Sequence, residues 1–153
     1  MNENIPKASC TTNDFDQEEA AKLKARLANQ KTHGKKFERV QSVSIADGAH
    51  KYVLIAAREP GRTELSHFVT SRRGARYHVN AAEPFVYQLE KSGYEDIAIE
   101  GGGRIYLEED SKKISIFGFS YTFGQADHER SKRVVLADER FKDFDVTVSN
   151  EGY

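Results

Sequence analysis

After Phe37 the chain carries apolar residues that alternate with polar ones or run together over short stretches, which is typical of β-strands. The apolar run KYVLIAAR at 51–58 suits a central strand that is covered on both faces. Three glycines follow the segment 96–100, and a β-bulge there could redirect the side chain of Arg104. Strands are predicted at residues 43–45, 51–58, 66–70, 96–100, 104–108, 113–119 and 144–149.

Two helices are predicted among these strands. Asn80 followed by Glu83 is a typical helix start, and Gly93 supplies a stop, which places Pro84 in the first turn, where proline is tolerated. The second helix is expected over residues 126–140. Two helices interleaved with six to seven strands indicate an α+β domain, in which a single mixed sheet carries the helices packed on it.

Residues 1–38 differ from the rest because they are polar and contain few aromatic side chains. One helix is predicted there, starting at Asp16 with Glu19 as a capping-box-like pair and presenting apolar residues on one face: Ala20, Leu23 and Leu27. A basic stretch follows, made of Lys31, Lys35, Lys36 and Arg39. The pattern favours a solvated, partly helical extension before a domain at 39–153, and an arm that recruits a partner is the alternative.

Composition excludes several classes of protein. A chain of 153 residues is most simply one domain with a core that needs no disulfides, and Cys10, its only cysteine, rules out an internal disulfide or thiolate cluster. A net charge of −1 provides no bulk field for nucleic acid. Because no apolar run is long enough to span a bilayer and no signal peptide is apparent, we expect a cytoplasmic protein without a membrane partner.

His78 is the main candidate for chemistry, since it precedes the expected helix start by two residues. Amides at a helix N-terminus bind anions, and the same positive end disfavours imidazolium. A neutral ring could accept a proton from water or attack phosphorus directly. The alternative is an ordinary surface or capping histidine. The five histidines form no HxH or HExxH pattern, so a metal site is not expected.

Further candidates could hold an oxyanion. Lys51 at the start of the central strand could direct its ammonium at phosphate, or simply end the strand in water. Arg104 follows the glycines, and its alternative is an edge-strand charge. A short loop between Gly118 and Gly124 offers hydroxyls and closely approaching amides, although it could also be an ordinary connection. The loop residues concerned are Ser120, Tyr121 and Thr122.

Together these stretches resemble the Janus/ocnus family, which includes the phosphohistidine phosphatases. The segments that carry the resemblance, over residues 43–153, are ADGAHKYVLI, RYHVN, GGGRI, SKKISIFGFSYTFG and FDVTVSNEGY. In appearance the chain is most similar to the insect branch. Tyr121 and Thr122 stand where the enzymatic relatives carry an apolar and then a small residue, and Thr70 stands where the vertebrate enzyme has arginine.

The resemblance implies a role for each candidate. His78 matches the catalytic proton acceptor, Lys51 the lysine that contacts the substrate phosphate, and Arg104 the arginine that supports the site. The loop of Ser120, Tyr121 and Thr122 matches the segment that binds phosphate, largely through main chain and the serine hydroxyl. The family requires no metal or other cofactor. Phosphohistidine-containing proteins would be the partners, and a monomer is expected.

The implied function is hydrolysis of the P–N bond of phosphohistidine, in a protein with a role in sex differentiation and the male germline. Two alternatives remain open. The chain could bind phosphorylated partners without turnover, as a regulatory protein in sexual differentiation. Alternatively, the fold could be a scaffold whose basic N-terminal arm recruits a partner. Whether His78 activates water or attacks phosphorus also stays open.

Overall fold

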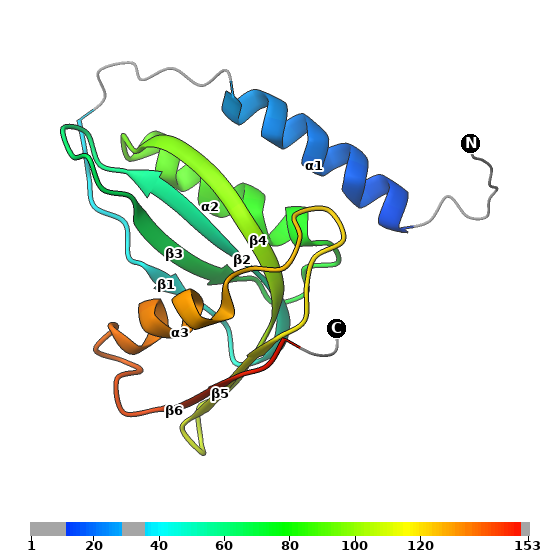
Figure 1. Cartoon of the computed structure of the whole chain (residues 1–153), viewed down its shortest axis with the longest axis vertical. Coiled ribbons are helices and arrows are strands. Elements are labelled where there is room, and N and C mark those ends of the chain that lie inside the picture. The colour runs from blue at the N-terminus through cyan, green and yellow to red at the C-terminus, as the bar shows by residue number, and fades with distance from the viewer. Residues whose placement is uncertain (1–11, 29–35, 151–153) are drawn as a thin grey trace.

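The computed structural model describes residues 12–28 and 36–150, which form one mixed sheet of six strands with helices on both faces (Figure 1). This is the predicted α+β class. The helices are α1 (Thr12–Ala28), α2 (His78–Lys91) and α3 (His128–Leu136). The strands are β1 (Val43–Ser44), β2 (Gly48–Arg58), β3 (Ser66–Ser71), β4 (Glu95–Glu108), β5 (Lys113–Phe117) and β6 (Asp145–Val148).

The strand order is β1-β3-β2-β4-β5-β6, with parallel pairs at the two edges and antiparallel pairs between them. Strand β2 lies inside the sheet, and its residues 52–57 are all buried. Val53 and Ile55 pack in the core beneath α2, whereas Tyr52 and Leu54 pack in the core beneath α3. The expectation of a central strand covered on both faces is therefore confirmed.

Strand β4 corrects one prediction. The expected break at the triple glycine is wrong, because β4 runs without interruption through Gly101, Gly102 and Gly103. The bulge expected near Arg104 is present: Leu54 pairs with Gly101 and the next β2 residue pairs with Ile99, which leaves Glu100 as the extra residue. A one-residue insertion reverses which side chains face each side of the sheet. Arg104 therefore lies on the face of the sheet that α2 covers.

Helix α2 begins earlier than predicted. Tyr77 occupies the cap position and His78 is the first helical residue, so the assignment of Asn80 as the cap is wrong. The Asn80 side chain instead accepts a hydrogen bond from the Tyr77 amide at 3.1 Å, from inside the first turn. Pro84 consequently falls in the second turn, where it leaves one helix carbonyl without its usual amide donor.

The remaining boundaries shift by a few residues. Helix α3 is shorter than the predicted 126–140. Its start is fixed by Asp127, which caps it by accepting a hydrogen bond from the Arg130 amide at 3.0 Å, and its last residue is Leu136. Strand β5 ends before the predicted residue 119, because Gly118 adopts a positive φ of 77° that turns the chain out of the sheet. Strand β6 is likewise shorter than predicted at both ends.

Helix α1 starts at Thr12 rather than at Asp16 and packs against α2 and β4 (Figure 1). Ala20 and Leu23 are buried, and Arg26 forms an ion pair with Glu90 of α2 at 2.6 Å. Several predicted features, including the basic residues 31 and 35 and the lone cysteine at position 10, lie outside the described residues. No helix in the described part of the chain is long and apolar enough to cross a membrane.

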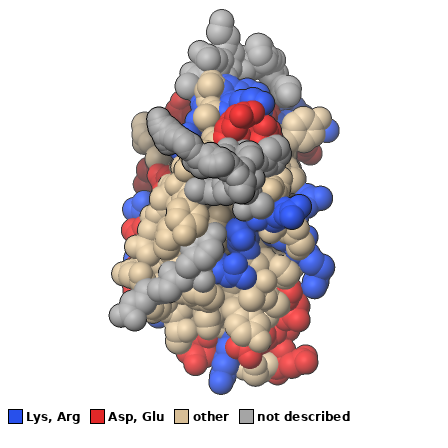
Figure 2. All heavy atoms as spheres, turned by 90° about the vertical axis from the view of Figure 1, so that its right-hand side faces the viewer, with Lys and Arg blue, Asp and Glu red and all other residues tan. Residues whose placement is uncertain are grey.

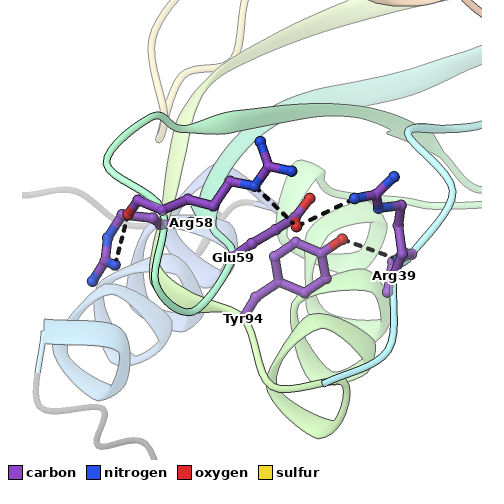
Figure 3. Close-up of polar contacts among 6 residues, drawn as sticks. Arg39, Arg58, Glu59 and Tyr94 are labelled. Carbon is purple, nitrogen blue, oxygen red and sulfur yellow. Dashed lines mark hydrogen bonds and ion pairs between the residues drawn. The ribbon is translucent and has the colours of Figure 1, made fainter. Parts of the chain in front are cut away.

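Polar contacts attach the segment before β1 to the turn between β2 and β3 (Figure 3). The Glu59 carboxylate accepts a hydrogen bond from Arg39 at 3.4 Å and forms an ion pair with Arg62 at 3.6 Å. The Val40 amide donates to the Tyr94 hydroxyl at 3.0 Å. These contacts hold the chain against the core from residue 39 onward.

Candidate functional site

His78 is buried at the N-terminus of α2, with only 1% of its surface exposed. Its Nε2 atom lies 2.9 Å from the carbonyl oxygen of Gly103 on β4. Because a carbonyl can only accept a hydrogen bond, Nε2 carries the proton. The lone pair of the neutral ring therefore resides on Nδ1, which is the atom that can act as a base or nucleophile.

The surroundings keep this imidazole neutral. Burial is the largest of the causes that lower the pKa of His78 to about 4; the positive charges of Lys51 and Arg104 also lower it, and the Gly103 hydrogen bond raises it. At pH 7 the ring is thus uncharged. The sequence predicted a neutral ring from the helix terminus, whereas in the structure desolvation is the largest cause.

Lys51 and Arg104 lie directly opposite each other on β2 and β4. Both are half-buried, and burial, followed by the charge of Arg104, lowers the pKa of the Lys51 ammonium. Like charges opposite each other on a sheet are destabilising. An anion between them would remove this repulsion. Figure 2 shows basic side chains gathered near the middle of the face at the right of Figure 1, with acidic side chains toward its lower end.

The loop after β5 folds tightly around Ser120, which is buried. Main-chain hydrogen bonds join Ser120 and Gly124 in both directions, at 2.8 and 3.1 Å. The Ser120 Oγ accepts hydrogen bonds from the amides of Thr122 and Phe123, at 3.3 and 3.1 Å. The hydroxyl of Ser120 thus holds the loop in shape by accepting hydrogen bonds from two of its amides.

Gly102 is the point at which the loop and the histidine meet. Its amide donates to the Gly124 carbonyl and its carbonyl accepts from the Ala126 amide, which docks the loop on β4. A Cβ atom at Gly102 would lie 2.8 Å from the His78 ring and 3.1 Å from the Ser120 side chain. Only glycine therefore permits these side chains to pack together on the strand.

The two other loop candidates differ from each other in exposure. Tyr121 is 60% exposed and packs edge-on against Phe119, with ring centroids 5.1 Å apart. The Thr122 hydroxyl lies 3.2 Å from the Ser120 hydroxyl and donates to Asp16 at 3.5 Å. Contacts and electrostatic interactions thus connect His78 with Lys51, Arg104, Ser120 and Thr122, whereas Tyr121 lies at the rim.

Asp16 is a site residue that sequence reasoning missed, since it was interpreted only as a helix start. Its carboxylate is buried, with 6% exposure, and accepts a hydrogen bond from the Val79 amide at 3.4 Å. Burial raises its pKa, while the Val79 and Thr122 hydrogen bonds and the Lys51 charge lower it. No local pattern signals this contact, because Asp16 and Val79 are 63 residues apart.

The arrangement suits a tetrahedral oxyanion. Two cations, a helix-terminal amide, a hydroxyl and a neutral imidazole come from four segments of the chain. Among residues 12–28 and 36–150, no group of three or more His, Cys, Asp or Glu side chains is placed to hold a metal ion.

Comparison with known proteins gives the family. The family model described as Janus/Ocnus matches residues 37–145, which is most of the chain. The chain belongs to the Janus/Ocnus family. The resemblance expected from the motifs is confirmed. All six candidate residues lie inside the matched segment, whereas Asp16 lies before it.

Curated members of the Janus/Ocnus family and their relatives are similar along most of their length. The sex-regulated protein janus-B of Drosophila melanogaster is 35% identical over 109 residues, covering 71% of this chain and 77% of the relative. Janus-B of Drosophila erecta is 35% identical over 111 residues, covering 72% and 79%. The human 14 kDa phosphohistidine phosphatase is 33% identical over 113 residues, covering 71% and 88%.

Proposed function

We propose that this chain is a phosphohistidine phosphatase that hydrolyses the P–N bond of phosphohistidine in proteins. One observation carries the proposal: His78 is buried and neutral, its lone pair is on Nδ1, and the charges of Lys51 and Arg104 both act on its ring. The name and 33% identity of the human phosphohistidine phosphatase support the substrate class. Catalysis of this kind needs a positioned base or nucleophile together with neutralisation of the phosphoryl charge.

In the proposed complex, Lys51 and Arg104 neutralise the phosphoryl oxygens. The Val79 amide and the Thr122 hydroxyl donate hydrogen bonds, as both already do to a carboxylate in this structure. Ser120 holds the loop in shape through its hydroxyl. Tyr121, which is exposed at the rim, contacts the protein around the phosphohistidine.

Two routes are compatible with a lone pair on Nδ1. In the first, Nδ1 takes a proton from water as the water oxygen bonds to phosphorus, and the P–N bond breaks as the leaving imidazole is protonated. In the second, Nδ1 itself bonds to phosphorus and displaces that imidazole, and water then hydrolyses the enzyme's own phosphohistidine. In both routes the Nε2–H bond to Gly103 holds the ring in one tautomer and orientation.

The test is release of inorganic phosphate from a phosphohistidine peptide. His78→Ala should lower kcat/KM by about 100-fold or more, the range expected for loss of a base or nucleophile. His50→Ala is the matched control, because His50 is next to Lys51 on β2 and bonds to the Asp47 carbonyl instead. Full activity in His78→Ala would overturn the proposal. Labelled phosphate trapped on His78 in rapid-quench samples would select the second route.

The names of the janus-B relatives support a second proposal, a role in sexual differentiation. In one form of this proposal, the site binds phosphorylated partners and does not hydrolyse them. Binding of a phosphohistidine peptide without release of phosphate would select it.

A further inference from the structure

Asp16 lies where the substrate phosphoryl group is proposed to bind. One carboxylate oxygen accepts from the Val79 amide at 3.4 Å, and the other accepts from the Thr122 hydroxyl at 3.5 Å. The positive charge of Lys51 also acts on this carboxylate. Two oxygens of a phosphoryl group would use these same donors and the same cation. Asp16 and a bound phosphoryl group therefore cannot both occupy them.

Helix α1 holds the Asp16 carboxylate in place through its packing on the core and through contacts with the loop after β5. Ala20 and Leu23 are buried in the main body of the protein. The Lys24 ammonium donates to the Thr122 carbonyl at 2.9 Å and lies 5.2 Å from the Phe123 ring centroid. The helix is thus attached to the same loop that forms one wall of the site.

The hydrogen bonds of Asp16 itself are long. At 3.4 and 3.5 Å they exceed the usual range of 2.7–3.2 Å, so each is weak. Burial raises the pKa of this carboxyl, which indicates that its charge is incompletely compensated. A weakly bound carboxylate can be displaced by a doubly charged phosphoryl group that makes shorter hydrogen bonds.

We propose that Asp16 is an internal competitor of the substrate. Helix α1 places its carboxylate on the anion donors, and a phosphoryl group binds when that carboxylate leaves them. Asp16 thereby sets the affinity of the site for anions and restricts it to ligands that bind strongly enough to displace it. The inference rests on the proposed function, since it assigns the same site to the phosphoryl group.

The test measures the Kd of inorganic phosphate by calorimetry on the full chain. Asp16→Asn removes the charge and should lower Kd by about tenfold, within the range of couplings between sites. Glu18→Gln is the matched control, because Glu18 is an exposed acid on the same helix, and its Kd should equal that of wild type. Leu23→Ala weakens the packing of α1 without changing any charge, and should also lower Kd.

Three outcomes would contradict the inference. An equal Kd in wild type and Asp16→Asn, with both binding phosphate, would overturn it and leave the phosphatase proposal intact. A higher Kd in Asp16→Asn would also overturn it, by making Asp16 a supporting residue. If no variant binds phosphate and none hydrolyses a phosphohistidine peptide, both proposals fail.

Discussion

At the scale of the residue, the chemistry depends on the protonation of His78. Burial is the main reason that its pKa falls to about 4, and the neighbouring charges of Lys51 and Arg104 add to the fall. The negative charge of Asp16, on α1, raises the pKa of Lys51. The Gly103 carbonyl fixes the tautomer by accepting the Nε2 proton. A base with this pKa stays unprotonated through the neutral range.

We predict that the ring protons of His78 titrate with a midpoint near pH 4, because desolvation penalises the imidazolium. The measurement is an NMR titration between pH 8 and the lowest pH at which the chain stays folded. His78→Ala identifies the resonance by its disappearance. A midpoint near the ordinary histidine value would contradict the prediction.

The same shift predicts how stability depends on pH. Since the folded pKa is lower than the unfolded one, the unfolded chain binds more protons between about pH 6.5 and 4, and stability falls as pH is lowered through that window. Through this shift His78 should lower the free energy of unfolding by about 2 kcal/mol at pH 5 relative to pH 7. Urea unfolding at both pH values checks this, and His78→Gln should lose less stability than wild type.

At the scale of the element, strand β4 brings the site together. Its bulge at Glu100 places Arg104 on the same face as Lys51, and Gly102 gives room to His78 and Ser120. Gly103 faces the other way, where an added Cβ would lie 2.8 Å from the His128 ring. The glycines thus let two layers of side chains approach one strand from opposite sides.

Gly102→Ala should therefore damage the site. The new methyl group would meet the His78 ring and the Tyr52 carbonyl at 2.8 Å, so the ring must shift from its bond to Gly103. Overpacking of this kind costs roughly 1–3 kcal/mol. We expect kcat/KM on a phosphohistidine peptide to fall more than tenfold in protein that is still folded by circular dichroism. Wild-type activity and stability in this variant would show that the close packing is unimportant.

At the scale of the whole molecule, the sheet separates a polar cluster from the site. On the α3 face, the Tyr52 hydroxyl lies 2.6 Å from His128 Nδ1 and 2.9 Å from the Ser131 hydroxyl. His128 Nε2 donates to the Gly118 carbonyl at 2.8 Å, so Nδ1 accepts from Tyr52. This buried cluster ties α3 to β2 and to the start of the loop.

Tyr52→Phe should destabilise the fold without changing the chemistry. Removing the hydroxyl leaves His128 Nδ1 and Ser131 without this buried partner, which costs about 1–3 kcal/mol. Urea denaturation should show a lower midpoint with an unchanged slope. The His78 titration midpoint should equal that of wild type, because the lost hydroxyl lies on the opposite face of the sheet. Unchanged stability would mean that water or another group replaces it.

Much of this architecture could be predicted from the sequence, because it follows from local patterns. The alternation of apolar residues predicted the strands, and the continuous run at 51–58 predicted the buried central strand. Residue chemistry alone nominated His78, Lys51 and Arg104 as groups that suit phosphate. The inferences about the fold succeeded where a property of neighbouring residues determines the structure.

Tertiary structure decided the rest. Three glycines suggested a break, yet pairing with β2 and the bridge between Gly102 and Gln125 keep β4 continuous there. The packing of His78 and Ser120 explains why glycine is needed at position 102. The position of Asp16 likewise depends on a contact between distant segments. The sequence determined which groups could bind an anion. Only the tertiary structure decided which of these groups lie close together. Their contacts join residues that are far apart in the sequence, and local propensity carries no information about such pairs.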